Sequence, residues 1–166
     1  AEVIGYARRL YDRLKTQVSV HIDDDDQNSP GWKFAEAELQ GIPIRIEVGP
    51  KDMEKNQVVL VRRDTYEKIP VDVNQAETRV KQLLEEIQNG LYHRALAFRK
   101  ENTHQAQDYA GFKRIVEEQG GFIECGWCGS ADCEAKIKEE TKATIRVLPM
   151  GRNEPPDGTC ILCGGK

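Results

Sequence analysis

Residues 29–68, SPGWKFAEAELQGIPIRIEVGPKDMEKNQVVLVRRDTYEK, contain the signals that decide the fold of the first half of the chain. Ser29 is placed to cap a helix, Pro30 suits its first position, and Gly41 is placed to end it. The segments IRIEVG and QVVLVRRD are rich in β-branched residues, which is typical of strands. The stretch therefore predicts a short helix followed by two strands, with the loop GPKDMEKN between them.

The segments on either side extend this pattern into an α/β layer. Residues 3–18 carry apolar side chains at the spacing of an amphipathic helix, and residues 18–23 (VSVHID) alternate like a strand. The acidic loop DDDDQNSPG leads into the quoted stretch, and the turn TYEK leads out of it to a short strand, IPVDV. This order of elements predicts an α/β domain with a mixed sheet over residues 1–74.

The pattern changes at residue 75. Apolar residues at helical spacing predict one long helix over residues 75–102, a candidate bridge between two domains. A second helix, DYAGFKRIVEEQ, is closed by a pair of glycines. The rest of the chain predicts the strand GFIECGWC, the helix ADCEAKIKEET, the strand ATIRVLP, a polar loop GRNEPPDG and the segment CILC. These elements predict a small α+β domain over residues 103–166.

Composition and charge limit the classes of function. The 166 residues are 39% hydrophobic and 31% charged, and the formal net charge is −4. An acidic chain does not offer a polyanion-binding surface over its whole area, so any nucleic-acid contact must be local. No stretch approaches the roughly 20 consecutive apolar residues of a membrane span, and charges interrupt the first segment where a signal peptide would be apolar. These features predict a cytoplasmic protein with reduced thiols.

All five cysteines fall in the last quarter of the chain. Cys160 and Cys163 form a C-x2-C pair followed by two glycines, typical of a tight turn whose N–H groups face the sulfur atoms. The partner pair is open: Cys125 and Cys128 have the commoner x2 spacing, whereas the x4 spacing of Cys128 and Cys133 ends at the start of a helix. A closed zinc site needs four thiolates, so one cysteine is spare and the site is predicted to be structural.

Two other interpretations of the cysteines are weaker. Free cysteines also pack as small apolar residues, but their number within about 40 residues, several of them next to glycine, is unusual for that role. A redox C-x-x-C motif belongs between a strand and a helix near the start of a βαβ unit, and neither pair has that context. Structural zinc is therefore the prediction.

The polar residues of the quoted stretch are of a kind that suits RNA. Charged and aromatic side chains occur together on its helix and strands: Glu38, Arg45, Lys51, Arg63, Lys68, Trp32 and Phe34. Arg and Glu on a strand-rich face can read the edges of unstacked bases, and Lys suits the phosphates between them. A solvated surface of mixed charge with two core aromatics explains the same residues, and composition alone favours that explanation.

Longer motifs connect the chain to a known family. Residues 29–68 resemble the run SPGWKF…ELKGVPIRIE.GP+D.E…Q.V.V.R of the anticodon-binding domain of prolyl-tRNA synthetase. Further along, ALAFRKENT, CG…CE..IKEET.AT.R..P and a final C..CG are similar to the carboxy-terminal zinc-binding domain of the archaeal/eukaryote-like branch of that enzyme. The resemblance covers nearly the whole chain in order, and the chain is identified as a member of this family.

The resemblance implies a fold and a set of site residues. The fold is the anticodon-binding domain of class II synthetases, an α/β fold around a five-stranded mixed sheet, followed by the small α+β zinc-binding domain. The domain reads the guanines of the tRNA(Pro) anticodon, and the positions that correspond to the family's base-reading residues are Glu38, Arg45, Lys51 and Lys68. The family's zinc cysteines, with x4 and x2 spacings, correspond to Cys128, Cys133, Cys160 and Cys163, which leaves Cys125 spare.

Three positions depart from the family pattern. Asp25 stands in place of a usual basic residue, Ala37 in place of a frequent Trp and Gln40 in place of a frequent Lys. Each change lowers positive charge or stacking surface, so weaker binding to tRNA is expected. The resemblance also implies that the catalytic domain, which binds ATP and Mg²⁺ and makes the parent a homodimer, precedes Ala1. The fragment alone is therefore expected to be inactive as a proline–tRNA ligase.

Two rival functions remain open. One is a free-standing RNA-binding accessory protein derived from the synthetase, and the other is a zinc-dependent protein-interaction module. The three histidines are scattered and are assigned no role: His21, His93 and His104. The run DDDD lacks the glycine and the final glutamate of an EF-hand and is interpreted as a solvated loop.

Overall fold

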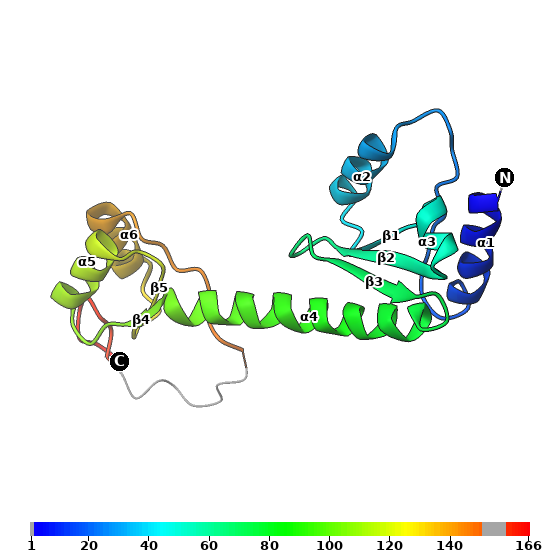
Figure 1. Ribbon diagram of the computed structural model, residues 1–166. Helices are drawn as coiled ribbons and strands as arrows, with labels where there is room; N and C mark the ends of the chain where they lie inside the picture. Colours follow the sequence, from blue (N-terminus) through cyan, green and yellow to red (C-terminus); the bar gives the residue numbers. More distant parts are fainter. Residues whose placement is uncertain (1, 151–158) are drawn as a thin grey trace. The chain divides into compact units, whose positions relative to one another are not determined.

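The computed structural model describes residues 2–150 and 159–166 and divides the chain into two compact units (Figure 1). The first unit comprises residues 1–93 and the second residues 94–166, and helix α4 (Ala76–Glu101) contributes to both. Each unit contains its own small sheet. No helix in the described ranges combines the length and the hydrophobicity that crossing a bilayer demands.

The sheet of the first unit has three antiparallel strands in the order β1-β2-β3: β1 (Ile44–Glu47), β2 (Gln57–Arg62) and β3 (Lys68–Asp72). The register aligns Arg45 with Val61 and Val61 with Lys68. Directly opposed residues share a face of a sheet, so Arg45 and Lys68 project to the same side. Leu60 and the residues paired with it project to the other side.

That other side of the sheet carries the core of the first unit. Helix α1 (Glu2–Leu14) and the first part of α4 contribute apolar residues that pack with β2. The buried residues of this cluster are Leu10, Leu14, Val58, Leu60, Ala76, Val80 and Leu83. Helix α2 (Pro30–Leu39) lies on the opposite side of the sheet from α4 (Figure 1). The sheet therefore has an apolar face and a polar face.

The caps of α2 match the sequence prediction. The Ser29 hydroxyl accepts a hydrogen bond from Trp32 N at 3.4 Å, Pro30 occupies the first position, and Gly41 follows with a φ of +79°. A short helix, α3 (Pro50–Glu54), was not predicted and occupies the loop between β1 and β2. Its start is fixed by the Asp52 carboxylate, which accepts from Gly49 N at 3.0 Å.

The α/β class is confirmed, but among the described residues the sheet is antiparallel rather than mixed, and one predicted strand of the first unit is wrong. Residues 18–23 alternate like a strand, yet they form no paired strand within the described residues. Val18 and Val20 instead pack their side chains against the core. Alternation identifies a segment with one buried side, whereas a strand also needs a partner for its backbone groups.

The second unit joins a two-stranded parallel sheet to two helices: β4 (Thr103–Gln105), α5 (Tyr109–Glu118), β5 (Phe122–Glu124) and α6 (Ala131–Thr141). Asp108 caps α5 by accepting from Gly111 N at 2.7 Å. The Tyr109 and Phe112 rings stack with their centroids 6.0 Å apart. The Glu140 carboxylate of α6 accepts from the Tyr109 hydroxyl and pairs with Lys113, which joins the two helices.

Helix predictions in the second half hold, whereas the strand predictions are only partly correct. The long helix, α5 and α6 lie within two residues of their predicted ranges. The predicted strand 121–128 is limited to Phe122–Glu124, because the chain then turns toward the cysteine cluster. Residues 143–149 are not a strand, and Val147 and Leu148 in this segment are exposed. The predicted loop 151–158 lies outside the described residues.

Candidate RNA-binding face and cysteine cluster

Arg45 lies at the centre of a polar cluster on the α2 side of the sheet. Its guanidinium is 3.1 Å from a carboxylate oxygen of Glu38 on α2 and 3.1 Å from one of Glu47 on its own strand. The Phe34 ring of α2 lies over the guanidinium, with 4.1 Å between the central carbon and the ring centroid. The side chains of Arg45 and Glu47 are 18% and 19% exposed. The cluster is therefore held in one arrangement by packing as well as by charge.

Two further basic residues extend this cluster along the sheet. Lys68 Nζ is 3.2 Å from the second carboxylate oxygen of Glu47, and the Lys68 side chain is 60% exposed. Arg63 Nε donates to the backbone oxygen of Glu38 at 2.9 Å. Four side chains thus form a continuous chain of alternating charge, here called the ion-pair network: Glu38, Arg45, Glu47 and Lys68.

Elementary periodicity explains why these side chains meet. Residues two apart on a strand point to the same face, which places Glu47 beside Arg45. Phe34 and Glu38 are four apart on α2 and therefore lie on one side of that helix. Sequence reasoning named Glu38, Arg45 and Lys68 but missed Glu47. The signal was the alternation of IRIE, which repeats a charged residue on the face of Arg45.

Lys51, the remaining predicted base-reading residue, is not part of the network. It is exposed on the short helix α3, and its ammonium group has no ion pair or hydrogen bond among the residues that the structure describes. A lysine without a protein partner is available to a phosphate as a flexible point charge. The structure therefore gives Lys51 and Arg45 different environments.

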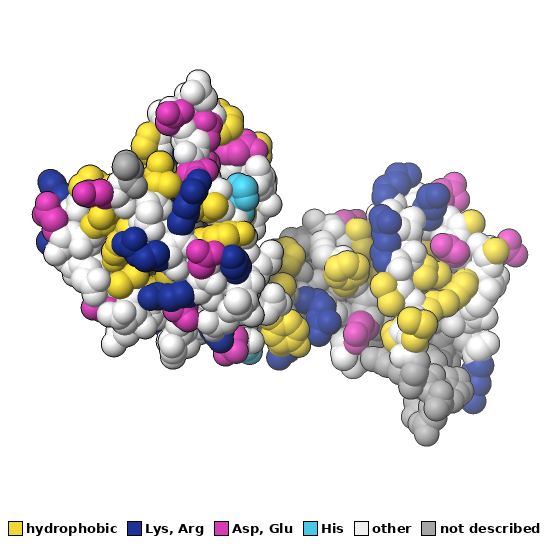
Figure 2. All heavy atoms as spheres, turned by 90° about the vertical axis from the view of Figure 1, so that its right-hand side faces the viewer, with side chains coloured by type: hydrophobic (Ala, Val, Ile, Leu, Met, Phe, Trp, Pro, Cys, Tyr) yellow, Lys and Arg dark blue, Asp and Glu magenta, His cyan; other side chains and the backbone are white. Residues whose placement is uncertain are grey.

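On the face drawn in Figure 2, Lys and Arg side chains lie in groups within each unit, with acidic and hydrophobic side chains interspersed among them. Together with the net charge of −4, this mixture gives little general attraction for a polyanion. The arrangement favours recognition through a few specific contacts.

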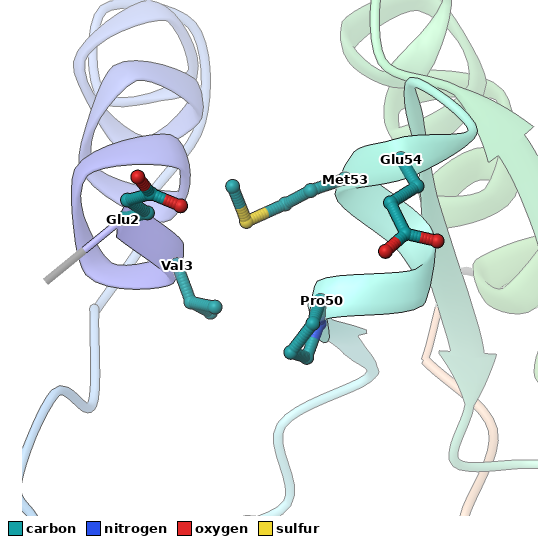
Figure 3. A pocket seen from close by; sticks show the side chains of 5 residues that line it. All are labelled: Glu2, Val3, Pro50, Met53 and Glu54. Carbon is teal, nitrogen blue, oxygen red and sulfur yellow. The ribbon is translucent and has the colours of Figure 1, made fainter.

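A separate pocket of ≈ 630 Å³ lies between α1 and α3 (Figure 3). The residues that line it are Glu2, Val3, Pro50, Met53 and Glu54. The Met53 side chain extends from α3 toward α1 (Figure 3). Among the described residues, the lining contains two carboxylates and no basic side chain, which makes the pocket unsuited to a phosphate group. It is not part of the RNA-binding candidate face.

Four cysteines lie together in the second unit: Cys128, Cys133, Cys160 and Cys163. Their sulfur atoms all lie within 4.8 Å of one another. Cys128 Sγ is 3.7 Å from Cys133 Sγ and 3.8 Å from Cys163 Sγ. Zn–S bonds of about 2.3 Å in a tetrahedron separate the sulfur atoms by roughly 3.8 Å. Four cysteines in this arrangement can bind a metal ion, and Cys125 is not among them.

The backbone around the cluster is organised by the glycine-rich turn at residues 160–165. Gly164 N donates to Cys160 O at 2.9 Å, and Gly165 N points at Cys163 Sγ at 3.4 Å. Ile161 N donates to Gly126 O at 2.9 Å, which ties this turn to the other cysteine-bearing segment. The fold therefore joins two chain segments that are far apart in the sequence.

The second segment is fixed by the start of α6. The Ser130 hydroxyl caps the helix by accepting a hydrogen bond from Asp132 N at 3.2 Å. The backbone carbonyl of Ser130 accepts a second hydrogen bond, from the Trp127 indole N–H at 3.1 Å. Cys133 lies in the first turn of this helix, where the positive end of the helix dipole favours a thiolate.

Close packing of the thiols changes their protonation. The hydrogen bond to Cys128, with burial added to it, raises the pKa of Cys133 to about 12. Burial opposes the ionisation of Cys160, yet the backbone N–H groups of Cys163 and Leu162 outweigh it and lower the pKa of Cys160 to about 6. One sulfur ionises readily while its neighbour keeps its proton, because like charges at this distance repel. Four thiolates here need a cation between them.

Comparison with known proteins identifies the class to which this fold and these sites belong. The family model "Anticodon binding domain" matches residues 1–83, and the model "Prolyl-tRNA synthetase, C-terminal" matches residues 109–166. The chain therefore belongs to the anticodon-binding domain family, in the form found in prolyl-tRNA synthetases.

The relatives point to one enzyme. A protein of Oceanobacillus iheyensis named proline–tRNA ligase is 52% identical over 164 residues, which cover 99% of this chain and 34% of that protein. Proteins of the same name from Natranaerobius thermophilus and Rubrobacter xylanophilus are 45% and 53% identical, over 98% and 92% of this chain and 33% of each protein. The chain spans about a third of the length of the curated relatives it matches.

Proposed function

We propose that this chain recognises the anticodon of tRNA(Pro) as the carboxy-terminal part of a proline–tRNA ligase. The observation that carries the proposal is the ion-pair network, in which Arg45 is held between Glu38 and Glu47 beneath the Phe34 ring. Membership in the anticodon-binding domain family supports the same conclusion. A solvated surface would leave these side chains free, whereas here the two charged base-reading candidates are preorganised.

Glu38 and Arg45 have complementary hydrogen-bonding capacities that suit guanine. The N1–H and N2–H₂ groups of guanine are donors, and the Glu38 carboxylate can accept from both. The O6 and N7 atoms of guanine are acceptors, which match the forked donors of Arg45. Adenine inverts the pattern at its exocyclic group, so the pair discriminates between neighbouring guanines and adenines.

In the free protein Glu38 and Arg45 satisfy each other at 3.1 Å. RNA binding exchanges this contact for contacts to bases. Glu47 keeps a second hold on Arg45, also at 3.1 Å, so the guanidinium remains oriented when Glu38 turns to a base. Glu47 is therefore proposed to position Arg45 and Lys68 rather than to touch RNA.

Lys51 and Lys68 are proposed to contact the backbone of the anticodon loop. Both are exposed, and lysine is a point charge with rotatable donors that suits phosphate better than a base edge. These contacts strengthen binding to any tRNA, and selection of the proline anticodon then depends on Glu38 and Arg45.

We propose that the cysteine cluster holds a structural zinc ion. The sulfur separations of 3.7 and 3.8 Å fit tetrahedral zinc–thiolate bonds, and all four positions are filled by protein ligands. Zinc at this point supplies a cross-link rather than chemistry. Cys128, Cys133 and the turn at residues 160–163 would be fastened to one another.

The activity of the whole protein is proposed from its relatives. Proline–tRNA ligase activity requires ATP and Mg²⁺, and we propose that these are bound in the part of the protein that this third does not include. A homodimer assembled through that part and a cytoplasmic location are proposed on the same basis. This chain would contribute the choice of tRNA.

The test is a binding titration of the chain at fixed salt against tRNA(Pro) with either GG or AA at the two anticodon positions. Glu38→Gln keeps the size of the side chain but replaces an acceptor with a donor. We expect it to cost about 1–3 kcal/mol of binding free energy with GG and to change little with AA. Equal weakening of both RNAs would reduce Glu38 to a surface carboxylate and defeat the proposal.

Lys51→Ala is the matched control for charge alone. It should weaken both RNAs equally and lower the slope of log K against log salt by about one. A protein-interaction module would show no preference for the GG RNA over the AA RNA. The same titration therefore separates that function from anticodon recognition.

A further inference from the structure

The turn between β2 and β3 carries an exposed tyrosine in a strained conformation. Tyr66 has a φ of +59°, in the left-handed region that side chains other than glycine and asparagine rarely adopt. Tyr66 is also 66% exposed to solvent. Burial therefore does not offset the strain. A bulky residue kept at such a position points to a use for its side chain outside the core.

Hydrogen bonds fix the backbone of this turn. Tyr66 N donates to Arg62 O, and Arg62 N donates to Glu67 O, each at 3.0 Å. The Arg62 guanidinium pairs with Asp64 at 2.9 Å and with Glu86 of α4 at 3.3 Å, and the Arg62 and Asp64 side chains are nearly buried. The ring of Tyr66 is thus presented from a rigid base.

The turn is also joined to the ion-pair network from both of its ends. Before Tyr66, Arg63 donates from its backbone N to Pro43 O at 3.0 Å and from its side chain to Glu38 O at 2.9 Å. After Tyr66, Lys68 pairs with Glu47 at 3.2 Å. The exposed ring therefore stands within three residues of contacts to Glu38 and Glu47.

We propose that the Tyr66 ring is a stacking platform for an unpaired nucleotide of the RNA loop whose guanines Glu38 and Arg45 read. This inference rests on the proposed function. Unstacked bases of RNA loops are stabilised by stacking on aromatic rings, and such stacking tolerates any base. An exposed ring on a hydrogen-bonded turn whose flanking residues contact Glu38 and Glu47 has the form such a platform needs.

The experiment titrates the chain with an RNA stem-loop that has the anticodon arm of tRNA(Pro). Tyr66→Gly removes the ring and suits the left-handed backbone, so the melting temperature should not fall. We expect it to weaken binding roughly 5- to 150-fold, whereas Tyr66→Phe should stay within about twofold of the parent chain. The salt dependence of binding should not change, because no charge is removed. Tyr92→Ala is the matched control, since Tyr92 is an exposed tyrosine on α4 outside the network.

Abasic substitutions in the RNA sharpen the test. When each unpaired loop nucleotide is made abasic in turn, one of these RNAs should bind Tyr66→Gly and the parent chain equally well, because the stacked base is already absent. If Tyr66→Gly binds the intact RNA as well as the parent chain does while Glu38→Gln still loses its GG preference, the platform is refuted and the anticodon function stands. If neither change matters, the anticodon function itself fails. Loss of binding with no single responsive nucleotide would also overturn the platform, since the ring would then act without stacking on a base.

Discussion

The two units of this chain hold themselves together in different ways. Residues 1–93 bury aliphatic side chains from two helices and a sheet in one cluster. In residues 94–166, the only buried side chains among the described ones are Phe112, Cys160 and Ile161. Hydrophobic burial stabilises the first unit. The second has far less of it, and we expect it to depend on its cysteine cluster, as small domains with a metal site do.

The difference also separates the tasks of the two units. The ion-pair network that we propose to read bases needs a rigid support, and the apolar face of the sheet provides one directly behind Arg45 and Lys68. The four grouped cysteines can supply all four ligands of a tetrahedral metal site, so we propose that the cluster only fastens its surroundings. Stability and recognition can then be perturbed separately.

The largest effect should follow loss of the metal. Removing zinc with a chelator, or with Cys133→Ser, is expected to unfold residues 94–166 and leave residues 1–93 folded. Zinc bound to four thiolates contributes on the order of 10 kcal/mol to such a domain, more than its few buried side chains supply. Amide hydrogen exchange should accelerate in α5 and α6 while β2 stays protected.

Cys125→Ser is the control for this prediction. It should keep one zinc per chain by elemental analysis, because Cys125 is not among the four grouped sulfurs. Metal lost from Cys125→Ser and retained by Cys133→Ser would show that the site uses two C-x2-C pairs. Unfolding of the whole chain on chelation would show that the units are not independent.

A cavity in the core of the first unit should destabilise that unit and leave the second unit unaffected, the reverse of the effect expected from loss of the metal. Leu60→Ala removes a fully buried side chain of β2 and is expected to cost about 2–5 kcal/mol of unfolding free energy in the first unit. Denaturant unfolding monitored separately in each unit measures this. Leu39→Ala, at an 83% exposed position of α2, should stay within about 0.5 kcal/mol. A similar cost at both positions would contradict the assigned core.

The same contrast explains what sequence alone could predict. The helices α2, α4, α5 and α6 were predicted to within two residues of their ends, and the strands of the central stretch were found, because each buries one side of a regular period. Helix α1 ends at Leu14, four residues before the predicted end, and α3 was not predicted. The strands predicted at 121–128 and 143–149 were too long or absent. Both strands lie in the second unit, where the chain between the helices runs to the cysteine cluster and not along a hydrophobic face. An alternating pattern of apolar residues carries no information about where the sulfur atoms lie.

The candidate site shows a similar limit. Glu38 and Arg45 were selected by the family resemblance, yet the motif did not reveal that they pair with each other or that Glu47 holds Arg45 from the other side. These contacts depend on strand register and on the packing of α2, which are tertiary facts. The residues of β4 gave no signal at all, since three polar residues form a strand only because β5 lies beside them.

A smaller effect is expected at the paired glycines between α5 and β5. Gly121 has a φ of +80°, and a Cβ there would lie 2.4 Å from the backbone oxygen of Asn102. Gly120 has a φ of +71° and open space around it. Alanine should therefore cost about 1–2 kcal/mol at Gly120 from conformation alone, and more at Gly121, where a backbone must also move.

Thermal unfolding of the two zinc-loaded variants measures the difference between these glycines. Equal destabilisation would mean that β5 does not approach the end of α4 as closely as the structure shows. In that case the parallel pairing of β4 with β5 would need revision, because Phe122 N bonds the same Asn102 oxygen at 2.8 Å.

The smallest effect should come from the ion pair that joins α5 to α6. Lys113, and after it the Tyr109 hydroxyl, lower the pKa of Glu140 below its ordinary 4.5. A carboxyl whose pKa is lower in the folded state stabilises the fold above its unfolded pKa, and this contribution is lost as pH falls through the folded pKa. The Lys113 and Glu140 side chains are both substantially exposed, so Lys113→Ala should hardly change the unfolding free energy.

The pKa of Glu140 is the sensitive observable, and NMR of its side-chain carboxyl carbon measures it. Lys113→Ala should raise the pKa of Glu140 toward 4.5, and Tyr109→Phe should raise it less, in the order of the two contributions. An unchanged titration in both variants would mean that the pair does not form in solution.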